Sequence, residues 1–223
     1  TSENLNLGLL INAINYKFSL DYWEIDYENR IEDQSAQALL NENLNGPAIT
    51  RNVDGDLIGV TTTYFNEEST EVAGIDLDLS YSFPINKFGD FDIRIVGTNL
   101  IKFSTPLVES GVSKMQNRVG RFNYDSHMHS LPRNRINLFF GINGKNFRHQ
   151  LNTRYIDSYK NTRAITGLGL TYGYKNKVDS FVVHDYCLKS SETFTPDFFN
   201  GKFNFGFCII NINDDDTPKC LGP

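Results

Sequence analysis

Apolar and polar residues alternate along one stretch of the chain, from Gly74 to Phe83. The odd-numbered positions carry Ile75, Leu77, Leu79, Tyr81 and Phe83, and the even-numbered positions carry Asp76, Asp78, Ser80 and Ser82. Successive side chains of a β-strand point to opposite faces, so this pattern predicts a strand with one apolar and one polar face. A protein core and a lipid bilayer would both accept such an apolar face.

The same alternation returns in other parts of the sequence. It runs over residues 16–22, 91–95, 135–142 and 202–209, with Phe139 as an exception. A soluble β-sandwich and a membrane-spanning β-barrel are both built from strands of this kind. The periodicity therefore predicts an all-β fold and leaves these two architectures open.

The segments between the predicted strands differ in length. Short segments are expected at 12–15, 84–89 and 143–145, and the last contains Asn143-Gly144, a signal for a tight hairpin. Long segments are expected at 32–57, 104–134 and 159–178. Short turns at one end and long loops at the other are typical of outer-membrane barrels, in which the short turns face the periplasm. This asymmetry favours the barrel.

The alternation changes phase near Tyr22, after which Trp23, Ile25 and Tyr27 occupy the other parity. A β-bulge would produce such a change. Emergence of the strand from the bilayer would also produce it, and would place Tyr22 and Trp23 in an aromatic girdle. One helix is predicted, over 35–44 inside a long loop, because Ser35 is a good N-cap for the alanines and leucines that follow.

The composition favours a β-rich protein and argues against nucleic-acid binding and a transmembrane helix. Aromatic residues make up 13% of the chain and there are 17 glycines, which favours strands and turns over helices. The net charge of -6 without a basic run argues against nucleic acid as a partner. No apolar run is long enough for a transmembrane helix, whereas strand alternation is compatible with the low mean hydropathy of -0.38.

Several longer segments carry a family resemblance in one consistent order. They are YKFSLDYWEIDYENRI, SAQALLNENL, ITRNVDGDLIGVTTTYFN and EVAGIDLDLSYSF, followed by GTNLIKFS, LPRNRINLFFGING, the strand ending HDY at Tyr186, and GKFNFGFCIININD. Together they resemble the β-barrel of a TonB-dependent outer-membrane receptor. The resemblance implies a transporter in the cell outer membrane rather than an enzyme. Its ligand would be scarce, of the siderophore, cobalamin or oligosaccharide class.

That family builds a barrel of about 22 strands around an N-terminal plug domain. Residues 1–223 show no plug, and the sequence stops at 221–223 without the aromatic residue of a last strand. We therefore expect the C-terminal part of such a barrel, with the plug domain and the final strand absent. The expected fold is an antiparallel, curved, open sheet of about 8–9 strands. A subsidiary strand is placed at 57–66, and the terminal strands at 4–11 and 202–211 are expected to stay unpaired with each other.

A few residues suggest chemistry of their own. Asp76 and Asp78 share a strand face, as an acid–base pair would, but charges facing a barrel lumen are the preferred interpretation. His127 and His129 suggest a metal or haem contact, yet no further ligands follow at a fixed spacing. The run 214–216 lacks the glycine and the spaced oxygens of a calcium loop, so a solvated loop is expected there.

The three cysteines are Cys187, Cys208 and Cys220, with no metal-binding spacing. A disulfide between Cys208 and Cys220 is conceivable in an oxidising compartment, but Cys208 as a small inward-facing residue is the preferred interpretation. No nucleophile, zinc-hydrolase or nucleotide motif occurs. We therefore predict no catalytic, cofactor-binding or metal-binding residue and no cofactor, and leave the ligand-binding residues unassigned.

The expected partners follow from the resemblance. They are outer-membrane lipid, a small-molecule ligand such as a siderophore, and TonB acting through the missing plug domain. Two alternatives stay open at this point. One is a passive outer-membrane porin, and the other is a soluble β-sandwich that acts as an adhesin or sugar-binding module.

Overall fold

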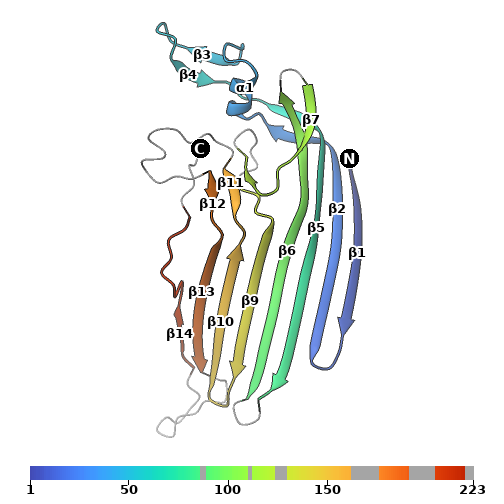
Figure 1. Ribbon diagram of the computed structural model, residues 1–223, viewed down its shortest axis with the longest axis vertical. Coiled ribbons are helices and arrows are strands. Elements are labelled where there is room, and N and C mark those ends of the chain that lie inside the picture. The colour runs from blue at the N-terminus through green and yellow to red at the C-terminus, as the bar shows by residue number, and fades with distance from the viewer. Residues whose placement is uncertain (86–88, 110–111, 124–129, 162–175, 191–203, 219–223) are drawn as a thin grey trace.

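A tall antiparallel sheet forms the body of the molecule (Figure 1). The computed structural model describes residues 1–85, 89–109, 112–123, 130–161, 176–190 and 204–218. The main sheet has nine strands in the order β1-β2-β5-β6-β9-β10-β13-β14, and β7 pairs with β6 beside this path. The strands are β1 (Ser2–Asn12), β2 (Tyr16–Asp33), β5 (Tyr64–Pro84), β6 (Asp90–Glu109), β7 (Val112–Asn117), β9 (Asn134–Asn143), β10 (Phe147–Ile156), β13 (Phe181–Ser190) and β14 (Gly206–Ile209).

Smaller elements gather at one end of this sheet (Figure 1). They are α1 (Ala36–Glu42), β3 (Ile49–Arg51), β4 (Leu57–Val60), β8 (Arg121–Phe122), β11 (Tyr159–Asn161) and β12 (Lys177–Val178). The predicted helix is confirmed, and the Ser35 side chain caps it by accepting from the Ala38 N–H at 3.4 Å. A subsidiary strand does begin at Leu57, as predicted, and it pairs with β3 in a separate hairpin. Its predicted end at residue 66 is wrong, because β4 ends at Val60 and residues from Tyr64 onward belong to β5.

The strand register gathers apolar side chains on one side of the sheet. Directly opposed residues of neighbouring antiparallel strands point to the same face. Tyr16 lies opposite Tyr81, Tyr81 opposite Ile93, and Ile93 opposite Phe140, so the alternation of each strand is in phase with that of its neighbours. We call this side the apolar face; it carries Leu7, Leu9, Ile11, Tyr16, Phe18, Leu20, Ile75, Leu77, Leu79, Tyr81, Phe83, Phe91, Ile93, Ile95, Ile136, Leu138, Phe140, Ile142, Leu151, Tyr155, Val182, Tyr186, Leu188, Phe207 and Ile209.

The opposite side, the polar face, carries charged and amide side chains. Members from neighbouring strands include Lys17, Ser19, Asp21, Asp76, Asp78, Ser80, Asp92, Arg94, Asn137, Arg148, Gln150, Asn152, Arg154, Asp185 and Lys189. No second sheet covers the apolar face within the described residues, and Leu7 and Leu9 are 71% and 53% exposed. A soluble sandwich would bury such side chains between two sheets. The sandwich alternative is therefore wrong.

Short and long connections lie at opposite ends of the sheet, as predicted (Figure 1). Residues 13–15 and 144–146 form short turns at one end, which we call the short-turn end. The other end, the long-loop end, carries α1 and the small sheets. The expected long loop at 104–134 is wrong in part, because β6 continues to Glu109 and β7 pairs back onto it. Strands β2, β5 and β6, of 18, 21 and 20 residues, exceed the about 9–11 residues that a bilayer requires.

The change of hydrophobic phase near Tyr22 is not caused by a β-bulge in β2. The register between β2 and β5 runs without a shift from Tyr16 opposite Tyr81 to Glu28 opposite Ser69. Trp23, Ile25 and Tyr27 thus lie on the same side of the sheet as the polar face. Glu24 and Asp26, between them, lie on the side that carries the apolar face nearer the short-turn end. Loss of the apolar pattern without a bulge fits a strand that has left the lipid.

The two terminal strands of the sheet form its edges. Strands β1 and β14 stand at opposite ends of the strand order and do not pair with each other in the described part of the chain. The expectation of an open sheet is confirmed. Strand β14 covers only Gly206–Ile209, so it is shorter than the predicted 202–211.

A disulfide joins the last two strands of the main sheet. Cys187 of β13 lies directly opposite Cys208 of β14, with their Cα atoms 4.2 Å apart, and the two are bonded. Cys208 has the parity of the polar face, as its interpretation as an inward-facing residue requires, but it is disulfide-bonded, which that interpretation did not include. The Cys208–Cys220 alternative is wrong. The sequence did not show this pairing because the register of the closing strand was unknown. Cys220 lies outside the described residues.

Tryptic mapping under non-reducing conditions tests this disulfide. Cleavage after Lys189, Lys202 and Lys219 places each of the three cysteines in a different peptide. We expect peptide 178–189 linked to peptide 203–219, with the link lost after reduction. Linkage of peptide 203–219 to the peptide that begins at Cys220 would contradict the structure.

Candidate functional site

Charged side chains on the polar face are held by partners on neighbouring strands. Arg94 donates to both carboxylate oxygens of Asp78, with Nε–Oδ1 at 3.1 Å and Nη2–Oδ2 at 2.7 Å. Asp76 accepts from the Thr98 hydroxyl at 2.6 Å. Each carboxylate therefore has its own donor, and the two are not arranged as a pair that shares a proton. The structure confirms both residues on the polar face, as predicted.

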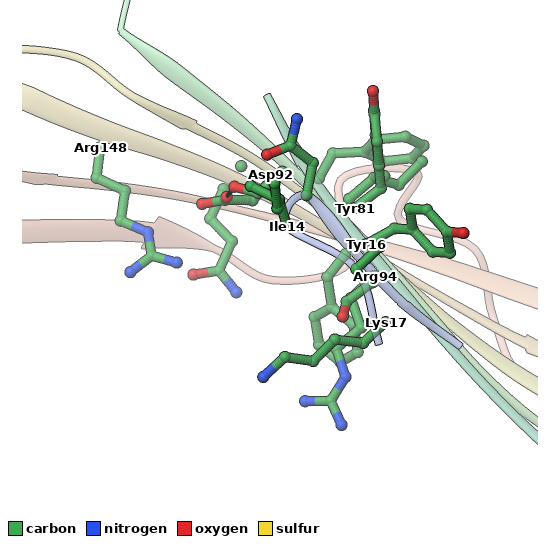
Figure 2. Close-up of a pocket in the computed structure, with 16 residues that line it drawn as sticks. Ile14, Tyr16, Lys17, Tyr81, Asp92, Arg94 and Arg148 are labelled. Atoms are coloured by element: carbon green, nitrogen blue, oxygen red, sulfur yellow. Dashed lines mark hydrogen bonds between the residues drawn. The ribbon is translucent and has the colours of Figure 1, made fainter. Parts of the chain in front are cut away.

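A hollow of about 440 Å³ opens at the short-turn end of the polar face (Figure 2). Lys17 of β2, Arg94 of β6 and Arg148 of β10 border it. Figure 2 shows Lys17 and Arg94 on one side of the ribbon and Tyr81 on the other. The space exists because Gly141 stands between Asp92 and Gln150 in the strand register and contributes no side chain.

The charges in this hollow are only partly satisfied. Asp92 accepts from the Ser82 hydroxyl and from the Asn143 amide, and Arg94 is held by Asp78. Within the described residues, the side chains of Lys17 and Arg148 make no hydrogen bond or ion pair. Each of these two cations is thus available to an anionic group that enters the hollow beside it.

Sequence reasoning missed this hollow. Lys17, Arg94 and Arg148 belong to different strands, and only the register between those strands shows that all three border one hollow. Lys17 is level with Arg94, and Arg148 lies two strands further along the sheet. One signal was present, since all three occupy the polar parity of their strands. Parity predicts the face of the sheet on which a residue lies, but it does not predict how far along the sheet the residue stands relative to the other strands.

Buried polar contacts stabilise the long-loop end. Thr70, 1% exposed, donates its hydroxyl to Glu67 at 2.7 Å, and Glu67 also binds Arg30 at 2.8 Å. Arg118, 3% exposed, donates its Nε–H to Thr105 at 3.0 Å. Buried polar groups with partners hold a single conformation. The extended strands and the segment after β7 therefore form a fixed polar platform at this end.

An ion pair lies on the side of the sheet where the apolar face ends. Lys102 pairs with Glu71, and the hydrogen bond that the Lys102 ammonium donates to this carboxylate raises the pKa of Lys102. Both side chains are about one third exposed, at 36% and 33%. A charged pair at this height indicates water rather than lipid outside the sheet.

The remaining candidates from the sequence gain no support as sites. His127 and His129 lie outside the described residues. Asp214 and Asp215 are exposed, and Asp215 accepts from Asn213 at 3.2 Å. The described residues contain no group of three potential metal ligands. They also contain no helix of the length and hydropathy needed to cross a membrane.

A single antiparallel sheet with an apolar face, a charged face and loops of unequal length at its two ends defines the wall of a transmembrane β-barrel. Residues 1–189 match the family model described as "TonB dependent receptor-like, beta-barrel". The chain belongs to this family. A search of curated proteins found no match.

Solved structures with the same fold are receptors of this kind. A mutant of the ferric enterobactin receptor PfeA of Pseudomonas aeruginosa matches with a TM-score of 0.56 and 13% identity, over 96% of this chain and 26% of that one. The ferric-catecholate import receptor Fiu of E. coli K12 matches at 0.55 and 15%, over 97% and 24%. The siderophore receptor PirA of Acinetobacter baumannii matches at 0.52 and 16%, over 96% and 27%. The chain thus spans about a quarter of each, and the likeness shows the fold.

Proposed function

We propose that this chain forms part of the wall of an outer-membrane receptor that imports a scarce ligand with energy supplied through TonB. The family match over residues 1–189 carries this proposal. The two-faced sheet supports it, because the apolar face suits lipid and the polar face suits a hydrated lumen that holds a plug domain and admits a ligand. The long-loop end would face the cell exterior and make the first contact with the ligand.

Within the classes considered, a ferric siderophore is the ligand we propose. The matching structures are named as receptors for ferric enterobactin, ferric catecholates and siderophores, and one PfeA mutant was solved in complex with enterobactin. The chemistry of the polar face agrees, since a ferric catecholate complex is anionic and the hollow presents Lys17 and Arg148, two cations that have no partner among the described residues. An uncharged oligosaccharide could accept hydrogen bonds from these cations but would gain no attraction between opposite charges.

A passive porin is the rival function, and energy dependence separates the two. The complete receptor is expressed in cells that lack their own catecholate receptors, with and without functional TonB. We expect radioactive iron from ferric enterobactin to accumulate only when TonB is functional. Accumulation that is unchanged without TonB would contradict the receptor and favour the porin. Uptake of cobalamin or maltooligosaccharide but not of any ferric siderophore would contradict the ligand class alone.

A further inference from the structure

Two cations lie directly opposite each other on the polar face, near the short-turn end of the sheet. Arg148 of β10 is aligned with Lys189 of β13 in the strand register, and both side chains are exposed. We call these two residues the cation pair. Opposed side chains of antiparallel strands stand about 5 Å apart at their Cβ atoms, and like charges at such positions destabilise the sheet. An anion between the two side chains would offset this repulsion.

The described residues supply no anion to the cation pair. Neither side chain makes a hydrogen bond or an ion pair with another described residue. Asp90 of β6 shares their row of the sheet but stands two strands from Arg148, about 10 Å at the usual strand spacing. Asp92, further from the short turns, already accepts two hydrogen bonds. The described part of the sheet therefore leaves both charges available to an anion from elsewhere.

Another cation on the same two strands does have a carboxylate partner. Arg154 of β10 pairs with Asp185 of β13, with 3.0 Å between Nη2 and Oδ2. The geometry of these strands thus permits an ion pair, and the cation pair lacks one because its row carries like charges. Lys17 of β2 is also without a described partner, and it borders the same hollow as Arg148. The short-turn end of the polar face therefore attracts anions.

The position of the cation pair relative to the membrane follows from the proposed function. The polar face lines the lumen there, and the short-turn end faces the periplasm. An imported ligand would pass the cation pair last, just before it leaves the barrel. A charged cleft raises the local concentration of ions of opposite charge and speeds their capture. An anionic ferric siderophore is such an ion.

We propose that Arg148 and Lys189 form an exit site, which binds the anionic ligand on its way from the lumen to the periplasm. The guanidinium of Arg148 offers a planar fork of N–H donors to the oxygens of the ligand, and the ammonium of Lys189 adds a mobile point charge. Both groups are exposed to water, where ion pairs are weak, so the ligand is also released. The inference rests on the proposed function and adds the residues that act at its last step.

Separate measurements of surface binding and of transport test the exit site. The complete receptor with Arg148→Gln and Lys189→Gln is expressed in cells that lack their own catecholate receptors, and radioactive ferric enterobactin is the probe. We expect its Kd on chilled cells to stay unchanged, because first contact occurs at the long-loop end. The maximal rate of TonB-dependent uptake should fall about tenfold, the lower end of what charged clefts contribute to capture rates. Arg148→Lys alone, which keeps the charge, should retain most of the rate.

Arg154→Gln combined with Asp185→Asn is the matched control. It changes two charged side chains on the same strands and the same face, but it leaves the net charge unaltered. This variant should bind and transport like the unaltered receptor, with rates normalised to the folded receptor measured by heat-modifiable migration on gels. Equal losses of rate in the two double variants would overturn the exit site, and so would an unchanged rate after removal of the cation pair.

Carboxylates of the plug domain are the other candidate partner of the cation pair, and leakage through the barrel separates the two cases. If the pair held the plug in place, its removal would let vancomycin enter the cells. We expect vancomycin sensitivity to stay at the level of the unaltered receptor, and a rise with unchanged iron uptake would overturn the exit site. Absence of TonB-dependent uptake by the unaltered receptor is a different result, which contradicts the proposed function itself.

Discussion

Replacing Leu77 with arginine is expected to destabilise the folded barrel by about 2–4 kcal/mol, the cost of a cation on the lipid face near the bilayer midplane. Leu77 lies opposite Leu20 and Gly97 on the apolar face. The charged Glu71 precedes it by six residues and the aromatic Phe83 follows it by six, so it stands near the middle of the lipid-contacting band. Urea-induced unfolding of the complete receptor in lipid vesicles measures the change.

Asp78→Asn is the matched control, one residue away on the polar face. It removes the ion pair with Arg94, but these two side chains are 41% and 56% exposed. Ion pairs in water contribute about 0–1 kcal/mol, so a small loss is expected. Equal losses for Leu77→Arg and Asp78→Asn would mean that lipid does not contact the side of the sheet that carries Leu77.

Replacing Gly89 with alanine is expected to impair folding severely. Gly89 adopts a φ of +107°, and a Cβ there would collide with the carbonyl oxygen of Asn143 and lie 3.0 Å from the Cα of Gly144. The left-handed backbone alone costs about 1–2 kcal/mol for a residue with a side chain. Overpacking against backbone that cannot move aside adds about 1–3 kcal/mol. The folded fraction, measured by heat-modifiable migration on gels, should fall accordingly.

Gly55→Ala separates the two causes. Gly55 has a similar φ of +88°, but nothing lies within 4 Å of an added Cβ. This variant should therefore lose only the about 1–2 kcal/mol of the backbone term. If Gly89→Ala loses no more stability than Gly55→Ala, the close approach of Gly89 to Asn143 and Gly144 is not present in the folded protein.

Local patterns in the sequence predicted most of the fold. Alternation assigned Leu77 to the apolar face and Asp78 to the polar face, because a strand has a period of two whatever its neighbours are. The helix after Ser35 was predicted because its cap lies next to it in sequence. The unequal loop lengths required only the approximate positions of the strands.

Features that depend on register or on the lipid boundary were not predicted. Cys187 and Cys208 pair because of the register that β14 adopts against β13. The sequence around either cysteine does not determine that register. Strand β6 continues to Glu109 although Pro106 lies within it and lipid no longer imposes alternation at that height. The hollow likewise depends on the placement of Lys17 on β2 and Arg148 on β10, two strands that are separated by three others.

Cysteine labelling of intact cells tests most directly whether this wall crosses the outer membrane with its long loops outside. Val53, in the β3–β4 hairpin, and Ile14, in the β1–β2 turn, are 101% and 102% exposed, so their intrinsic accessibility is matched. Each is replaced by cysteine in a Cys220→Ser background of the complete receptor, and a membrane-impermeant maleimide is applied. We expect the cysteine at position 53 to be labelled in intact cells, and the cysteine at position 14 to be labelled only after the outer membrane is opened. Labelling of position 14 but not of position 53 in intact cells would contradict the account.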